Sequence, residues 1–432
     1  MSTSAHSNVV ARLAQMRQLW EQAAENYFEP LGFRLALQNC VTTSRTVTFI
    51  LQSNKSSIDG FDEWYSAFQE RWRQDPIMRW AVEARNTIEK QGDLEMFSQA
   101  RATIVASYVG SVGTDWVPQA LFKSPQEILL SVPSKYRQIQ QVHEHGTLII
   151  ERRWVINTLP EHEVLSALAH VYKELTMLVN DLRARTGSRG DSVDAEPISM
   201  RPLVMDRAVY LAMKDGSEWG LRLFPQPDAS QDKERIERRY RKFTDWSALE
   251  RATTFRDVCD VFFANARGLM LKDGYHRSMA LFFKGLSLDQ IVGMEHPTRG
   301  SRYVIVRELA ALAAATGVDG VMLISEAWTA KREDVPPSGY AAEAKRRGEA
   351  LVMSAADAKG AAYHYEATVE RKLVKRDKVK RLGPTKVAED TAFITVPFQQ
   401  VWGCADLQAI IAREEQMAAM GIDPNYDERV KG

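Results

Sequence analysis

The amino-acid sequence predicts an α+β protein with two domains. An antiparallel helical bundle with a small β flap comes first, and an α/β domain with a mixed sheet follows. Three observations support this. Residues 7–100 carry apolar side chains at helical spacing in successive segments. Residues 103–156 hold short β-branched stretches, and beyond 198 strand and helix patterns alternate. The 432 residues, 45% hydrophobic and 26% charged, suit two globular domains.

The predicted helices of the bundle span residues 7–28, 31–52, 61–73 and 75–92. The last of them has the clearest boundaries. Asp75 can cap the first turn, Pro76 suits the first helical position, and Gly92 suits the end. In the second helix, residues 41–50 are rich in Thr and Val, so a strand is the alternative there.

The first domain, residues 1–186, also contains a predicted β insertion at about 103–156. Its strands are expected at 103–109, 127–132 and 147–156, because these stretches are β-branched and lie between Gly, Pro and Ser residues. A helix at 161–185 is expected to return to the bundle. Residues 187–197 have almost no apolar side chain and are expected to form a linker.

The second domain is predicted at 198–420, with a polar tail at 421–432. A strand, a helix and a strand at 278–283, 301–316 and 320–328 have the spacing of a β-α-β unit, and helices are expected at 253–271 and 405–419. Residues 349–354 and 362–374 are expected to form an antiparallel hairpin with one solvated face. A strand at 391–398 is expected at a sheet edge because Pro397 lacks an amide donor.

The run Arg85-Asn86-Thr87-Ile88-Glu89-Lys90 resembles the signature of the HEPN superfamily of helical-bundle ribonucleases and toxins. That signature is an arginine, usually followed by a polar residue, with a histidine four to six positions later. The resemblance covers roughly residues 7–100 or, more widely, also the helix at 161–185. It implies that Arg85 would bind a phosphate, that Asn86 would orient it, and that the site would be shared across a dimer.

The histidine position of that signature falls on Lys90. A lysine has an ordinary pKa of about 10.4, so it cannot accept a proton efficiently at neutral pH. The resemblance therefore implies an RNA- or nucleotide-directed stress or defence module. It would bind phosphate through Arg85, Asn86 and Lys90 without cleaving, as a homodimer.

Charge is balanced overall, at 56 Lys plus Arg and 56 Asp plus Glu, so binding to a polyanion requires a local patch. Two segments qualify. Residues 371–381 hold seven basic side chains, and residues 235–242 form a second basic cluster with Tyr240 in its sequence. Together they can form a surface that follows phosphates. The alternative is that the lysines serve solubility and protect a strand edge.

Two other functions remain open. His276, Glu326 and Glu349 lie near strand ends of the second domain, where ligands bind in α/β sheets, so a small-molecule ligand protein or an enzyme is one alternative. The structural interpretation is that Glu326 forms an ion pair with Arg307 or Arg347. The other alternative is an oligomeric scaffold that uses the aromatic stripe of residues 61–73. The residues leave open whether the protein is an enzyme.

The sequence argues against several classes of protein. The three cysteines are far apart in sequence and form no CxxC pair, which suits a reducing cytosol. No signal-peptide pattern or apolar span appears, so a cytoplasmic protein without membrane contact is expected. The chain has no GK[ST] phosphate loop, GxGxxG after a strand, GxSxG or HExxH motif. No cofactor or metal is predicted.

Overall fold

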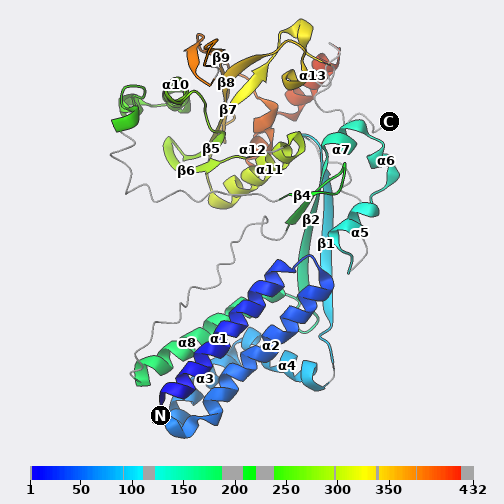
Figure 1. The fold of residues 1–432 in the computed structure, drawn as a ribbon, viewed down its shortest axis with the longest axis vertical. Coiled ribbons are helices and arrows are strands. Elements are labelled where there is room, and N and C mark those ends of the chain that lie inside the picture. Colours follow the sequence, from blue (N-terminus) through cyan, green and yellow to red (C-terminus); the bar gives the residue numbers. More distant parts are fainter. Residues whose placement is uncertain are drawn as a thin grey trace. The chain divides into compact units, whose positions relative to one another are not determined.

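The computed structural model describes residues 2–90, 92–109, 122–186, 208–219, 238–295, 298–336, 340–375 and 377–419 (Figure 1). The chain divides into two compact units. The first comprises Met1–Ala102, Asp115–Val132 and Ile149–Val209, and the second comprises Thr103–Thr114, Pro133–Leu148 and Tyr210–Gly432. The fold class is α+β, as predicted. The expected linker, 187–197, and tail, 421–432, lie outside the described residues.

Among its described residues, the first unit contains five long helices. They are α1 (Ser2–Glu25), α2 (Pro30–Ser53), α3 (Phe61–Gln74), α4 (Pro76–Lys90) and α8 (Val164–Thr186). The helix α2 is continuous through residues 41–50, so the alternative of a strand there is wrong. As predicted, α8 returns to the bundle, where it packs against α1, α2 and α4. Apolar stripes of all five helices form one buried core.

Asp75 begins α4 and joins it to α8. Its carboxylate accepts the backbone N–H groups of Ile77 and Met78 and lies 2.6 Å from Nε2 of His170. Burial raises the pKa of this carboxyl, but the hydrogen bonds to His170 and the two amides outweigh burial and leave the pKa below its ordinary value. The predicted cap is therefore confirmed, and it also carries a tertiary contact.

Of the three strands expected in the β insertion, 147–156 is confirmed, 103–109 overlaps an observed strand only at 103–105, and 127–132 is wrong. Residues 127–132 fall largely in the helix α5 (Pro125–Leu130), because Ser124 and Glu127 form a capping box and Pro125 occupies the first turn. The strands β1 (Met96–Val105) and β2 (Thr147–Ile156) join β3 (Ala208–Ala212) and β4 (Glu218–Trp219) in a sheet of order β1-β2-β3-β4. The sequence patterns did not predict β3, β4 and two short helices, α6 (Ser134–Arg137) and α7 (Gln140–His145).

The second unit contains a larger sheet of order β10-β9-β8-β7-β5-β6, with β11 beside β9. Its strands are β5 (Met279–Lys284), β6 (Ser287–Gly293), β7 (Gly320–Thr329), β8 (Gly348–Asp357), β9 (Ala362–Arg371), β10 (Val379–Leu382) and β11 (Lys386–Ala388). Every described pairing in this sheet is antiparallel, where a mixed sheet was expected. The predicted hairpin of β8 and β9 is confirmed.

The expected β-α-β unit is wrong, because β5 and β7 pair antiparallel. The strand β6 was not predicted, and it forms a hairpin with β5 through a turn that contains Gly285 at φ 60°. The helix α11 (Arg299–Thr316) therefore connects β6 to β7, which run in the same direction on either side of β5. The β5–β6 hairpin reverses the chain before α11 begins, so β7 runs antiparallel to β5.

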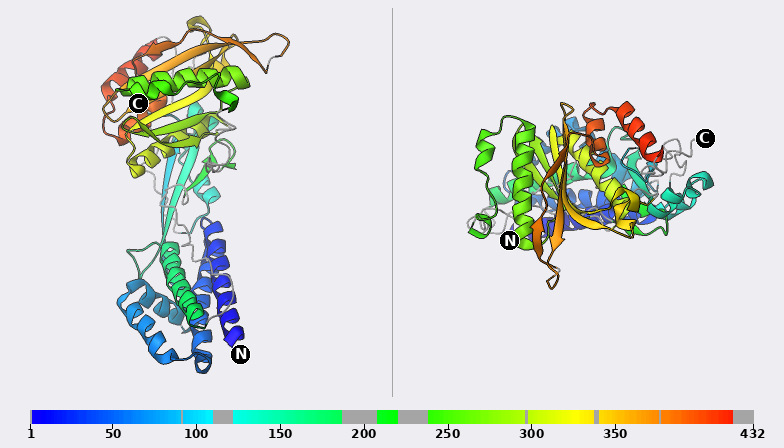
Figure 2. Two further views of the ribbon diagram at one scale, coloured as in Figure 1. Left: turned by 90° about the vertical axis from the view of Figure 1, so that its left-hand side faces the viewer. Right: turned by 90° about the horizontal axis from the view of Figure 1, so that it is seen from above.

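Helices cover both faces of this sheet (Figure 2). On β5, Leu281 and Phe283 share a core with α10 (Phe255–Asp273), whereas Phe282 contacts Phe398 of α12 (Val396–Val401). The strand predicted at 391–398 is wrong, because Pro397 occupies the first turn of α12, where its missing donor is tolerated. The last described helix is α13 (Leu407–Ala419), and none of the described helices is both long and apolar enough to span a membrane.

The Asp75 contact predicts a specific acid dependence of stability. A carboxyl with a lowered pKa in the folded state stabilises the protein above its ordinary pKa of 3.8, and this contribution is lost as pH falls through the lower folded value. Asp75→Asn keeps a capping side chain but removes the charge. Urea unfolding should give a variant that is less stable by about 1 kcal/mol at pH 7 and has a weaker loss of stability below about pH 4. Identical pH profiles for both proteins would contradict this role.

Candidate functional site

The structure places the candidate residues of the bundle on the exposed side of α4. Nη2 of Arg85 lies 2.5 Å from Oε2 of Glu89, one turn ahead, and Nη1 donates to Oδ1 of Asn86 at 3.1 Å. Lys90 is exposed at the end of the helix. A hollow of about 400 Å³ lies between α2, α3, α4 and α8, but Arg85, Asn86 and Lys90 do not line it. The charge of Arg85 is thus balanced by its own helix.

The three candidates of the second unit do come together. Nη2 of Arg371 lies 3.2 Å from Oε2 of Glu326, and Nε lies 2.5 Å from Oε2 of Glu349. The other oxygen of Glu326 accepts the backbone N–H of His276 at 2.7 Å. The expected ion pair of Glu326 exists, but its partner is Arg371 rather than Arg307 or Arg347.

Arg371 also fixes the end of α10. Its Nη1 donates to the carbonyl oxygen of Gly274 at 2.9 Å, so one guanidinium connects β7, β8 and β9 to the turn that follows α10. His276 lies in the same turn and is only 8% exposed. Burial lowers the pKa of its imidazole, because desolvation disfavours the charged form. Its Nδ1–H donates to the carbonyl oxygen of Arg277 at 2.8 Å.

Beside this turn lies a cleft of about 960 Å³, which we name the α10 cleft. Its lining is dominated by cationic and aromatic side chains. The lining residues are Arg238, Arg239, Tyr240, Arg241, Thr244, Trp246, Leu269, Asp273, Tyr275, His276, Arg277 and Met279. All belong to the second unit, and most come from the two chain segments that flank α10.

The arginines of the α10 cleft differ in how their charge is balanced. Arg239 lies 2.6 Å from Asp273, which also accepts the hydroxyl of Tyr240 at 2.8 Å. Arg238, Arg241 and Arg277 are exposed, and among the residues that the structure describes they have no carboxylate within ion-pair distance. Within the described ranges, the positive charge of these three arginines is therefore uncompensated. This charge lies at the C-terminal end of α10, where the helix dipole favours cations.

Two glycines bring the basic segments against α10. A Cβ on Gly268 would lie 1.6 Å from the carbonyl oxygen of Phe243, so the segment after Tyr240 lies directly on the helix. Gly274 ends α10 at φ 90°, and a Cβ there would lie 2.2 Å from the carbonyl oxygen of Asp377. The two basic clusters predicted at 235–242 and 371–381 therefore meet at one end of α10, as far as they are described.

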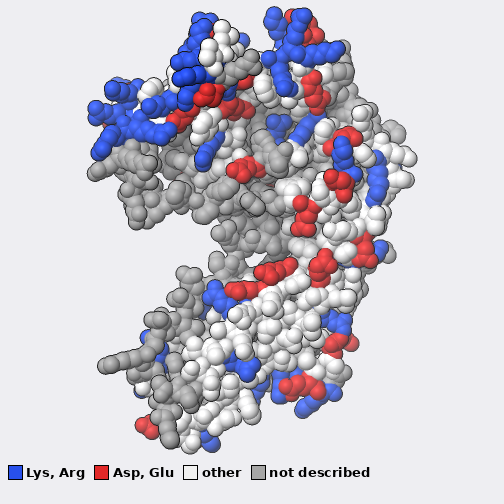
Figure 3. All heavy atoms as spheres, in the orientation of Figure 1, with Lys and Arg blue, Asp and Glu red and all other residues white. Residues whose placement is uncertain are grey.

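Figure 3 shows the result on the surface, where Lys and Arg side chains gather over α10 and the β9–β10 hairpin at the upper left. Aromatic faces lie within this region. Trp246 is 44% exposed and Tyr275 is 53% exposed. The ring of Trp246 is held edge-on against Phe262 of α10, with centroids 5.1 Å apart. The site thus combines exposed aromatic rings with guanidinium groups that no described carboxylate pairs.

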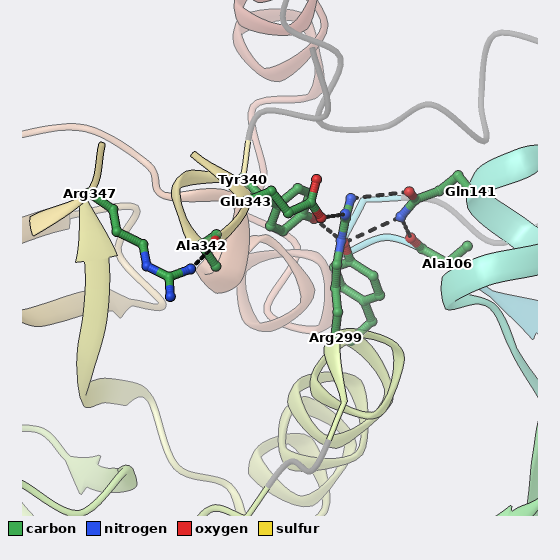
Figure 4. Close-up of polar contacts among 8 residues, drawn as sticks. Ala106, Gln141, Arg299, Tyr340, Ala342, Glu343 and Arg347 are labelled. Carbon is green, nitrogen blue, oxygen red and sulfur yellow. Dashed lines mark hydrogen bonds and ion pairs between the residues drawn. The ribbon is translucent and has the colours of Figure 1, made fainter. Parts of the chain in front are cut away.

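A second polar cluster, around Arg299 of α11, serves the structure instead (Figure 4). Its Nε donates to the hydroxyl of Tyr303, Nη2 donates to Oε1 of Gln141, and Nη1 lies 3.2 Å from Glu343. The guanidinium also lies over the ring of Tyr340. With 12% of its side chain exposed and all of these partners inside the second unit, Arg299 has little capacity left for a ligand.

Trp246, Asp273, Tyr275 and Arg277 are among the cleft residues that the sequence did not predict. A signal was present for two of them, because Tyr275 and Arg277 closely follow the glycine that ends a helix, and a turn after a helix end is exposed. Trp246 had no local signal. Its place in the cleft depends on the close approach of its segment to Gly268.

Gly268 supplies a direct test of this arrangement. In Gly268→Ala the added methyl group would meet backbone atoms of Phe243, so the segment at 240–246 must move away from α10. We expect that hydrogen exchange will become faster in this segment and that the free energy of unfolding will fall by about 1–3 kcal/mol. The control is Gly360→Ala, where an added Cβ meets nothing within 4 Å. Its φ of 90° strains an alanine, so the free energy of unfolding can fall there too, but exchange at 240–246 should stay as in wild type. Unchanged exchange at 240–246 would contradict the packing.

The comparisons with known proteins place the chain in a family. A family model described as Bacteriophage lambda protein ea47 matches residues 4–415. A relative from Escherichia phage lambda, Protein ea47, is 34% identical over 327 residues, which cover 74% of this chain and 78% of the relative. No solved structure matches. Because the match extends over nearly the whole chain, the protein belongs to the phage lambda Ea47 family.

Proposed function

We propose that the protein binds single-stranded nucleic acid in the α10 cleft. Arg238, Arg241 and Arg277 would hold phosphates, and Trp246 and Tyr275 would stack on bases. The observation that carries this proposal is the combination, around one cleft, of exposed aromatic faces with guanidinium groups that have no carboxylate partner among the residues the structure describes. Proteins that bind single strands combine these two features, since every phosphate is anionic and every base has a π face.

The charge distribution supports a polymeric anion. The whole chain is neutral by count, so the excess of positive charge at the α10 cleft is a local property of the fold. Basic residues also continue beyond the cleft on Lys372, Lys375 and Lys378 of the β9–β10 hairpin, whose base packs against Gly274. A small anion would use only one part of this surface, whereas a strand can follow it.

The aromatic residues favour a single strand over a duplex. In a duplex the base faces are covered by their neighbours, so exposed aromatic rings find no partner there. In a single strand each stacked base contributes about 1–3 kcal/mol. Because the ring of Trp246 is held by Phe262, little side-chain entropy is lost when a base stacks on it.

The arginines can be tested through the salt dependence of binding. We expect that Arg238→Ala, Arg241→Ala and Arg277→Ala will each weaken binding to a labelled oligothymidylate on the order of tenfold. Each should also reduce the slope of log K against log salt by about 0.7, because one phosphate contact is lost. Fluorescence anisotropy at several salt concentrations measures both quantities.

Two control variants accompany this experiment. Lys359→Ala removes an exposed charge at the opposite end of β9, so binding and slope should not change. Arg85→Ala tests the bundle site that the HEPN resemblance implies, and it too should bind normally. Wild-type protein that binds no single strand, or a triple arginine variant that binds as tightly as wild type, would overturn the proposal. Loss of binding in Arg85→Ala would move the site to α4.

The aromatic residues should behave differently from the arginines. Trp246→Leu and Tyr275→Leu remove a stacking surface but no charge, so we expect a loss of affinity of about 5–100-fold for each stacked base, with an unchanged salt slope. The matched control is Leu271→Ala, an exposed apolar side chain of α10 outside the cleft. Equal weakening of single-strand and duplex binding would exclude base stacking as the source of affinity.

A further inference from the structure

The loop that joins β9 to β10 carries an apolar pair at an unusual place. Leu373 is 94% exposed and Val374 is 95% exposed, the highest values among the large apolar side chains that the structure describes. Burial of each would contribute about 1.5–3 kcal/mol. In Figure 2 the hairpin extends outward from the sheet. If the loop only protected an edge strand, polar or charged residues would be expected at its end.

The loop is well anchored at its base. The backbone N–H of Lys372 donates to the carbonyl oxygen of Lys378 at 3.0 Å. The backbone N–H of Lys378 donates to the carbonyl oxygen of Lys375 at 2.9 Å. Below these bonds, Arg371 is fixed by Glu326 and Glu349. The exposed apolar pair therefore belongs to a loop that is hydrogen-bonded at its base.

The charges around this pair suit an anionic partner. Lys372, Lys375 and Lys378 are exposed, and none has a carboxylate within ion-pair distance in the described part of the chain. Lys380 and Arg381, further down the hairpin, pair with Glu370 instead. In its described residues the loop thus presents two apolar side chains with three cations beside them that have no carboxylate partner.

The loop also lies next to the α10 cleft. The carbonyl oxygen of Asp377 would lie 2.2 Å from a Cβ on Gly274, whose neighbours Asp273 and Tyr275 line the cleft. Val374 is three residues from Asp377, so their α-carbons are at most about 11 Å apart. A nucleic acid that occupies the cleft therefore comes within reach of Leu373 and Val374.

We propose that Leu373 and Val374 form a wedge that enters between neighbouring bases where a duplex meets the single strand held in the α10 cleft. This inference rests on the proposed function and adds a duplex junction as the preferred substrate. Apolar side chains that enter a base step unstack it at a cost of a few kcal/mol, which their own burial and the phosphate contacts of the flanking lysines offset.

A membrane is the weaker partner for the same loop. Leu373 and Val374 together contribute at most about 6 kcal/mol of apolar burial. A myristoyl chain, which buries more CH₂ groups at about 0.8 kcal/mol each, gives only marginal membrane binding by itself. Continuity with the α10 cleft favours nucleic acid.

The test uses full-length protein and a duplex with a single-stranded tail, with 2-aminopurine in the duplex at the junction. We expect that wild-type binding will raise 2-aminopurine fluorescence several-fold as the base unstacks. Leu373→Ser with Val374→Ser should keep the affinity for an isolated single strand within about threefold but lose the fluorescence rise. Val387→Ser on β11, also partly exposed, is the control and should behave as wild type.

The outcomes separate the two proposals. An unchanged fluorescence rise in the double variant, or no rise with saturated wild type, would overturn the wedge while single-strand binding still supports the cleft. Failure of wild type to bind any single strand would overturn the proposed function itself. Sedimentation with vesicles containing phosphatidylserine that depends on Leu373 and Val374, without any fluorescence rise, would overturn the wedge in favour of a lipid surface. The melting temperature of the double variant should equal that of wild type, since neither side chain is packed.

Discussion

One guanidinium, that of Arg371, joins three strands of the larger sheet to the turn that shapes the α10 cleft. It lies at the end of β9, binds carboxylates on β7 and β8, and donates a further hydrogen bond to the carbonyl oxygen of Gly274. Two acidic side chains on neighbouring strands would repel each other without it. Because the same group holds the turn after α10, it positions His276, Tyr275 and Arg277 at the edge of the α10 cleft.

The α10 cleft is cationic because several of its arginines have no carboxylate partner among the described residues, whereas arginines elsewhere in the chain are paired. Arg85, Arg299 and Arg371 all have acidic partners, so their charges act within the structure. Arg238 and Arg241 are brought onto α10 by the close approach at Gly268, where the described residues offer no such partner. In a chain with 56 charges of each sign, this local excess is created by folding and not by composition.

Local signals in the sequence predicted much of the fold. The helices of the bundle, the cap at Asp75 and the β8–β9 hairpin follow from periodicity, capping residues and turn chemistry. The errors come from short elements. The hairpin partner β6 has no buried face pattern in its first half, so periodicity does not predict it, and the expected direction of β7 is wrong as a result. Pro397 has no backbone N–H, and both an edge strand and the first turn of a helix tolerate this. The proline therefore does not distinguish between the two, and a strand was expected where α12 forms.

The candidate site was predictable only in its parts. Both basic clusters and the set of His276, Glu326 and Glu349 follow from residue type and from position in the chain. Their meeting at α10 depends on contacts between residues far apart in the sequence, such as Arg371 with Gly274 across 97 positions and Arg267 with Gly383 across 116. No local pattern encodes these contacts. The HEPN resemblance of the bundle stays a prediction, and Arg85 is paired with Glu89 on its own helix.

The most direct measurement is photochemical cross-linking of a single-stranded oligonucleotide to the full-length protein, with the cross-linked peptides identified by mass spectrometry. Binding in the α10 cleft predicts cross-links at Trp246 and Tyr275, within residues 238–246 and 275–277. Cross-links confined to residues 76–90 of α4, or none above the level given by a denatured control, would contradict it.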